Sequence, residues 1–212
     1  MAGQADAACA PSGATALLAS AISYALGACV QVAPGEMALP TPCADWDLAA
    51  LLAHLATSMA DLEAAIRTGH LDVDPGKPDS PENPAPPDAD DGDPVETLRD
   101  QAANLLVACY AHHGPDRFVV VGGLPLPAGI VACTGAVEIA VHGWDVSAAR
   151  GRRGAIPPAL ATRMLRLCPL LVTGREGLFG APVQVPAQAS PGDRLVGYLG
   201  RDPATPPLVT GQ

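Results

Sequence analysis

Basic residues are scarce in this chain of 212 residues. Its 22 acidic residues outnumber the 12 basic ones, which gives a formal net charge of −10 at pH 7. Lys77 is the single lysine, and no arginine precedes Arg67. Binding to nucleic acid or to an anionic membrane depends on clustered Lys and Arg side chains. We therefore expect neither a nucleic-acid partner nor a membrane partner.

Aromatic residues are also scarce, at 3% of the chain, although 49% of the residues are hydrophobic. The core must therefore be made mainly of Ala, Leu and Val side chains. Such a composition suits closely packed helices better than a β-sandwich. The length suffices for one domain of about 150–200 residues with a small appendage. We expect a fold that is mainly all-α.

The segment Ala7–Gly35 contains no charged residue, which raises the question of a signal peptide or a membrane span. A signal peptide begins with a cationic region, but the only charge before this segment is Asp6. Pro11 and Gly27, together with several Ala and Ser residues, weaken the segment as a span. We interpret it as an Ala-rich core helix and expect a cytoplasmic protein.

The six cysteines show no C-x-x-C spacing. Their scattered positions fit neither a secreted disulfide framework nor a zinc ribbon. We expect them to be small apolar side chains of the core in a reducing compartment. They are Cys9, Cys29, Cys43, Cys109, Cys133 and Cys168.

Apolar residues recur at helical spacing in five segments, and capping residues mark several of their ends. Asp47 and Asp93 are good N-caps, Pro94 suits the first helical position, and Gly69 is a typical stop. The predicted helices are Thr15–Val32, Asp47–Gly69, Asp93–His113, Ala128–Ala149 and Pro157–Gly174.

Three other segments complete the expected organisation. Phe118–Val121 and Leu124–Leu126, joined by two glycines, predict a small β-hairpin. Residues 70–93 hold six prolines and eight acidic residues, which predicts a solvated loop. The last forty residues are rich in Gly and Pro and are expected to wrap the bundle as a loop. The expected domains are a helical bundle over 1–175, with the acidic loop 70–93, and a C-terminal tail over 176–212 packed on the bundle.

Glu138 and His142 form the strongest local anomaly in the sequence. They lie four residues apart in an apolar helical segment, so they share one helix face. A buried carboxylate needs a hydrogen bond, a neutral state or a metal ion. A simple Glu–His hydrogen bond would satisfy the pair without any metal. His54, also in an apolar helical run, offers a third ligand, and two imidazoles with one carboxylate are typical of a catalytic metal site.

The remaining polar candidates are weaker. Asp145, three residues after His142, is either a carboxylate that orients that histidine or an ordinary surface residue near a helix end. His112 and His113 end a predicted helix, and His70 follows a helix-terminating glycine, so we interpret all three as terminal residues rather than ligands.

Two separated segments and a C-terminal stretch resemble a known family. Thr41–Leu55 (TPCADWDLAALLAHL) is similar to the T-P-C-x-x-W…L-x-x-H-L segment of the actinobacterial mycothiol-dependent maleylpyruvate isomerase family, which is DinB-like. Gly135–Gly151 (GAVEIAVHGWDVSAARG) resembles the E-x-x-x-H-G-W-D segment of the same family. Phe179–Pro203 resembles the ending of a metal-binding subgroup of these proteins.

The resemblance implies a DinB-like four-helix bundle in which His54, Glu138 and His142 bind a divalent metal, usually Zn²⁺. It also implies an enzyme that uses mycothiol, as cofactor or co-substrate, in thiol addition or transfer to an electrophilic small molecule or in its isomerisation. A thiol and a small-molecule electrophile are then the expected partners.

Two other functions stay open at this stage. A metal-dependent hydrolase, lyase or cyclase would use metal-bound water or Lewis-acid activation without a thiol. A non-enzymatic bundle with a vestigial site is the third possibility, and the presence of all three ligand residues disfavours it.

Overall fold

The computed structural model describes residues 11–30, 32–43, 46–71, 93–112, 117–152, 154–172 and 179–204. Most of the predicted acidic loop, Cys9 and His113 lie outside the described residues. The predicted domain boundary at residue 175 also lies outside them.

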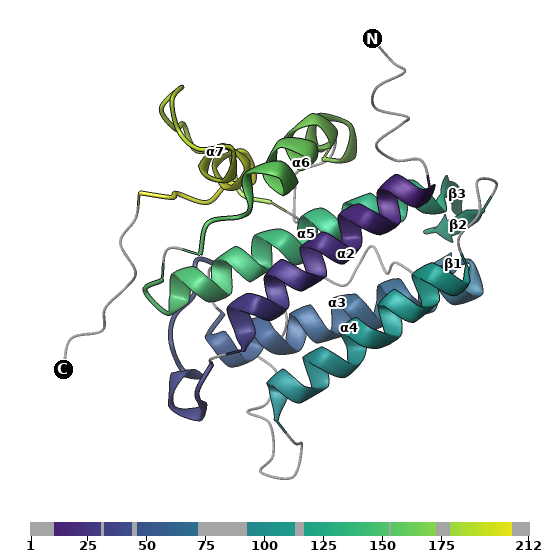
Figure 1. The fold of residues 1–212 in the computed structure, drawn as a ribbon, viewed down its shortest axis with the longest axis horizontal. Helices are drawn as coiled ribbons and strands as arrows, with labels where there is room; N and C mark the ends of the chain where they lie inside the picture. Colours follow the sequence, from purple (N-terminus) through teal and green to yellow (C-terminus); the bar gives the residue numbers. More distant parts are fainter. Residues whose placement is uncertain are drawn as a thin grey trace.

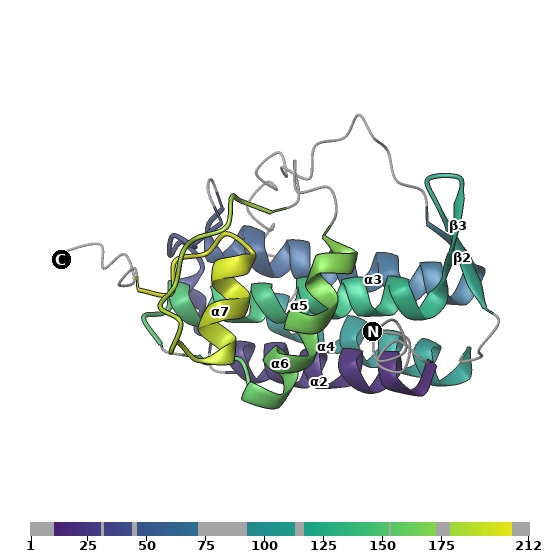
Figure 2. The same cartoon turned by 90° about the horizontal axis from the view of Figure 1, so that it is seen from above.

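Four long helices form the core of the molecule (Figure 1). They are α2 (Pro11–Cys29), α3 (Leu48–Thr68), α4 (Pro94–Ala111) and α5 (Ala128–Ala149), with a 3-10 turn η1 (Pro34–Glu36) after α2. α5 packs against α2 on one side and α3 on another, and α4 packs against α3 (Figures 1 and 2). The core consists mainly of Ala, Leu and Val side chains, as the composition predicts. The expected mainly helical bundle is confirmed.

The helix ends follow the capping residues read from the sequence. The Asp47 side chain accepts a hydrogen bond from the Ala50 N–H at 2.8 Å and begins α3. Gly69 ends the same helix in the left-handed conformation, with φ 76°. Asp93 accepts from the Val95 N–H at 2.9 Å and begins α4. These local signals therefore fix where α3 begins and ends and where α4 begins.

A three-stranded sheet lies at one end of the bundle (Figure 2). The predicted hairpin is confirmed as β2 (Phe118–Val121) paired antiparallel with β3 (Leu124–Pro127). The sequence did not predict β1 (His70–Leu71), which pairs in parallel with β2. Two residues are too few to show an alternating pattern, so only the contact with β2 defines this strand.

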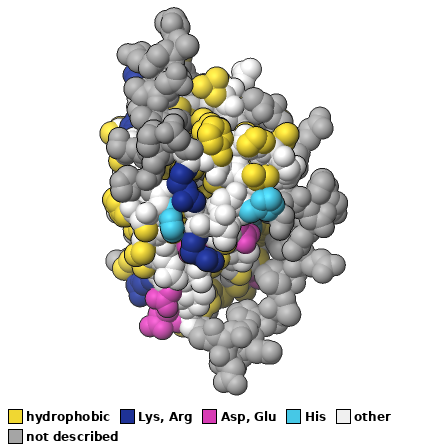
Figure 3. Space-filling model, turned by 90° about the vertical axis from the view of Figure 1, so that its right-hand side faces the viewer, with side chains coloured by type: hydrophobic (Ala, Val, Ile, Leu, Met, Phe, Trp, Pro, Cys, Tyr) yellow, Lys and Arg dark blue, Asp and Glu magenta, His cyan; other side chains and the backbone are white. Residues whose placement is uncertain are grey.

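The sheet end of the bundle presents a mixed surface. Phe118 and Leu124 are exposed on the hairpin. Figure 3, which faces this end, shows Arg and His side chains beside hydrophobic ones. The Arg117 guanidinium donates to the Ile66 carbonyl at 2.7 Å and lies 3.5 Å from Nδ1 of His112. His70 also belongs to this end, in β1.

Two further helices, α6 (Pro158–Leu171) and α7 (Pro191–Tyr198), pack against each other beside the bundle (Figure 1). The expectation of a tail without helices was wrong, because α7 interrupts it. Ser190 caps α7 by accepting from the Asp193 N–H at 3.1 Å, and Pro191 occupies the first turn. Leu195 and Val196 are fully buried, so this short helix is held by packing.

α2 and α5 approach each other closely at Gly143. A Cβ atom built on Gly143 would lie 2.8 Å from the Cα atom of Ala25, closer than real side chains come. Only a residue without a side chain fits between the two backbones at this point. The close packing expected of an aromatic-poor core is realised here.

Among the described residues, α3 is the one helix long and apolar enough to cross a membrane by length and composition. Half of its apolar window is buried inside the protein, and a core helix passes the same test. No firm membrane span follows from it.

Candidate metal centre

α3 and α5 bring the three predicted ligand residues together. His54 lies on α3, and Glu138 and His142 lie one turn apart on α5. One ligand atom from each residue lies within 4.8 Å of the others. His54 Nε2 is 3.4 Å from Oε1 of Glu138, and the two imidazole rings meet edge to face with centroids 5.0 Å apart. Two imidazoles and one carboxylate at this separation are a donor set that suits Zn²⁺.

Ser58 joins this set although the sequence gave no signal for it. It lies one turn after His54 on α3 and faces the same side. Its hydroxyl donates a hydrogen bond to Oε1 of Glu138 at 2.7 Å and lies 3.4 Å from Nε2 of His54. The His54 and Glu138 side chains remain 22% and 35% exposed, so small molecules can reach this side of the set.

Glu138 is held in its ionised form. Burial opposes ionisation, but the hydrogen bond from His54, the charge that His142 carries when protonated and the hydrogen bond from Ser58 together outweigh it. The pKa of Glu138 therefore lies below its usual range. An ionised carboxylate is the form that binds a metal ion.

Asp145 lies completely buried behind His142. Its Oδ2 is 3.0 Å from Nδ1 of His142. A carboxylate can only accept, so the proton of this hydrogen bond belongs to Nδ1. Nε2 of His142 then keeps the lone pair that a metal ion needs. Of the two alternatives left open for Asp145, the surface residue near a helix end is wrong, because the side chain is 0% exposed.

Arg201, on the segment after α7, neutralises Asp145 from the other side. Its Nη2 donates to Oδ2 at 2.9 Å and its Nε donates to Oδ1 at 3.3 Å, so the guanidinium binds both carboxylate oxygens. Burial opposes ionisation of Asp145, but the hydrogen bond with His142 and the charge of Arg201 overcome it. The pKa of Asp145 is held below its usual range.

Cys43 completes this buried network. Its thiol donates to Oδ2 of Asp145 at 3.2 Å, and its Sγ lies 3.8 Å from Nδ1 of His142. Burial, with the charge of Asp145, raises the pKa of Cys43 to about 12, so the thiol stays protonated at neutral pH. The expectation of an apolar core residue was wrong for Cys43. Cys29, Cys109, Cys133 and Cys168 are buried, as expected.

A second group of ligand atoms, from Cys43, His142 and Asp145, also lies within 4.8 Å. The Arg201 guanidinium contacts two of its members, with Nη2 3.3 Å from the Cys43 sulfur. A positive side chain thus contacts two of the three residues that would bind a metal ion there. The polar contacts of His54 and Glu138 described above are with each other and with Ser58, so this group fits a metal better.

The indole ring of Trp46 lies beside the imidazole rings of His54 and His142. Its ring centroid lies 4.5 Å from that of His54 and 6.1 Å from that of His142. The indole ring thus lies closer to His54 than to His142. It also gives a bound molecule an apolar surface next to the polar set.

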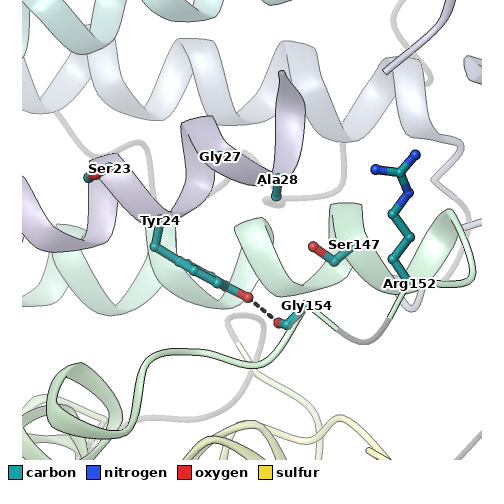
Figure 4. Close-up of a pocket in the computed structure, with 7 residues that line it drawn as sticks. All are labelled: Ser23, Tyr24, Gly27, Ala28, Ser147, Arg152 and Gly154. Atoms are coloured by element: carbon teal, nitrogen blue, oxygen red, sulfur yellow. Dashed lines mark hydrogen bonds between the residues drawn. The ribbon is translucent and has the colours of Figure 1, made fainter. Parts of the chain in front are cut away.

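A separate cleft of about 450 Å³ lies between α2 and the segment after α5 (Figure 4). Figure 4 shows the Tyr24 hydroxyl donating to the Gly154 carbonyl, at 2.6 Å. Ser147 and Arg152 line the cleft with them, but none of the predicted ligand residues does. His70 and His112 also stay apart from the set, at the sheet end of the bundle.

These features define a helical bundle with a candidate metal centre between two of its helices. The chain belongs to the mycothiol maleylpyruvate isomerase N-terminal domain family, whose model matches residues 18–147. The match includes His54, Glu138 and His142, whereas Arg201 lies outside it. No curated protein and no solved structure matches the chain. The family resemblance seen in the sequence is confirmed.

Proposed function

We propose that His54, Glu138 and His142 bind one divalent ion, Zn²⁺, and that this centre activates a low-molecular-weight thiol for reaction with an electrophilic small molecule. The observation that carries the proposal is the His, Glu, His donor set between α3 and α5, with ligand atoms within 4.8 Å. Membership of a mycothiol-related family favours mycothiol as the thiol.

The chain's own residues prepare the set for this role. Asp145 accepts the Nδ1 proton of His142 and so directs Nε2 to the ion. Ser58 holds the Glu138 carboxylate through a 2.7 Å hydrogen bond. The hydrogen bond between His142 and Asp145 is buried, so water competes little with it.

Three protein ligands leave at least one coordination position for a small molecule. Coordination to such an ion deprotonates a thiol at neutral pH. The partial exposure of His54 and Glu138 gives the thiol and the electrophile access, and Trp46 offers an apolar surface beside them. The reaction is an addition, a transfer or an isomerisation, and a reducing cytoplasmic compartment would keep the thiol available.

Thiol titration of metal-loaded protein tests the proposal. Adding mycothiol should release about one proton per site, because free alkyl thiols titrate near pH 8.5 and metal ligation deprotonates them. The cobalt-substituted protein should show a thiolate-to-metal charge-transfer band on the same addition.

The matched variants are His54→Ala, which should lose the metal and both signals, and His70→Ala, which should keep them. If fully metallated protein gives neither signal at millimolar mycothiol, the thiol proposal is wrong. A metal-dependent hydrolase, lyase or cyclase that uses no thiol then becomes the leading function.

A further inference from the structure

The Arg201 side chain is held at all three of its guanidinium nitrogens. Nε and Nη2 donate hydrogen bonds to the Asp145 carboxylate, and Nη1 donates to the Leu199 carbonyl at 3.0 Å. Nη2 also reaches the Cys43 sulfur. The side chain is only 10% exposed and Asp145 is 0% exposed. The charge of Arg201 is therefore fixed at one place rather than free on the surface.

At that place the guanidinium lies against two members of the second ligand group, Cys43 and Asp145. Cys43, His142 and Asp145 offer sulfur, nitrogen and oxygen atoms within 4.8 Å of one another. Such a mixed set suits a soft or borderline divalent ion. The guanidinium gives the carboxylate the positive partner that a metal ion would otherwise supply, and it repels an approaching cation at short range.

The end of α7 positions Arg201 for this contact. Gly200 adopts the left-handed conformation, with φ 86°. The Gly200 N–H bonds the Gly197 carbonyl and the Arg201 N–H bonds the Val196 carbonyl, which together form a Schellman motif. A Cβ on Gly200 would lie 2.7 Å from the Cα of Gly180, so the turn has room only for glycine.

We propose that Arg201 acts as a built-in cation that keeps metal ions out of the Cys43–His142–Asp145 group and limits the centre to one ion. This inference rests on the proposed function only for the ion held by His54, Glu138 and His142. Arg201 is thus a residue that determines metal stoichiometry, delivered by the segment after α7.

Metal titration of the wild type and of its Arg201 and Cys43 variants tests the inference. Each is loaded with Co²⁺ or Cd²⁺ without added thiol, and bound metal per chain and thiolate-to-metal absorption are measured. The wild type should bind one equivalent with no thiolate band. Arg201→Met should bind a second equivalent, with release to solvent of the Cys43 thiol proton and the Nδ1 proton of His142, and show a thiolate band, which the double variant with Cys43→Ser should lack. Arg201→Lys should behave like the wild type, because the ammonium keeps the charge.

Two results would overturn the inference. One is a folded Arg201→Met protein that binds no more metal than the wild type and shows no thiolate band. The other is a thiolate band in metal-loaded wild type that Cys43→Ser removes, and this result needs no Arg201 variant to fold. Thermal unfolding followed by circular dichroism establishes folding in each case.

The same experiment separates this inference from the proposed function. The band attributed to Cys43 is the difference between Arg201→Met and its Cys43→Ser double variant, measured without mycothiol. It does not depend on whether mycothiol binds. If the metal-loaded wild type gives no response to mycothiol but Arg201→Met gains the Cys43 band, the proposed function is wrong and the inference about Arg201 is supported.

Discussion

The two faces of α5 are built on opposite principles. The face toward α3 carries Glu138, His142 and Asp145, whose polar atoms have hydrogen-bond or ionic partners. The face toward α2 carries Gly143, where the lack of a side chain lets two backbones meet. One face depends on partners being present, and the other depends on a side chain being absent.

The difference predicts how each face fails. Removing one member of a buried polar network leaves its partner without a counter-charge, which lowers the free energy of unfolding directly. Adding a methyl group to a close helix contact forces a shift that neighbouring residues share. The polar face should therefore be the more sensitive to a single substitution.

The largest effect is expected for Asp145→Ala. The change leaves the buried Arg201 guanidinium without its carboxylate and should cost about 3–5 kcal/mol of unfolding free energy. It also frees Nδ1 of His142, so metal affinity should fall about 10–100-fold. Chemical denaturation and metal titration measure the two effects.

Asp61→Ala is the matched control, because Asp61 is exposed on α3. It should change unfolding free energy by less than about 0.5 kcal/mol. If Asp145→Ala is no more destabilised than this control, the buried pair does not support the fold.

A smaller effect is expected for Gly143→Ala. Its new Cβ would meet the Ala25 backbone at 2.8 Å, so the helices must move apart. We expect a loss of about 1–2 kcal/mol after the gain in helix propensity. Gly27→Ala, on the exposed side of α2 with nothing within 4 Å, should instead be stabilising by about 0.5–1 kcal/mol. Equal unfolding midpoints for the two variants would show that the close contact is not needed.

The two faces should also differ in acid, and this is the smallest effect because it acts only below about pH 4. The folded-state pKa of Asp145 lies below its unfolded value, so its ionisation stabilises the fold above the unfolded pKa. That stabilisation is lost as pH falls through the folded pKa. In metal-free protein, the stability difference between wild type and Asp145→Asn should shrink below about pH 4, whereas the difference for Gly143→Ala should stay constant. A constant difference for both variants would contradict the assigned ionisation of Asp145.

Local signals in the sequence predict most of the fold. Asp47, Gly69 and Asp93 act on neighbours within a few residues, so caps can be recognised without tertiary contacts. α7 carried similar signals in Ser190 and Gly200, but its eight residues lie in a Gly- and Pro-rich tail that resembles a loop. β1 had no local signal, since its partner strand β2 follows only after α4 in the sequence.

The candidate site divides in the same way. Glu138, His142 and Asp145 share one helix, so their spacing predicts that they meet. His54 stood out because it interrupts an apolar helix. Cys43 and Arg201 reach Asp145 across 102 and 56 residues, and no spacing rule links them to it.

The contact between Arg201 and Cys43 joins residues 158 positions apart, and this distance orders events during synthesis. At about 5–20 residues per second, a ribosome needs roughly 8–30 s to travel between them. For that interval the nascent chain carries Cys43, and later His142 and Asp145, without the guanidinium that will sit among them. The Arg201 guanidinium is thus the last part of the centre to be synthesised, after Cys43, His142 and Asp145.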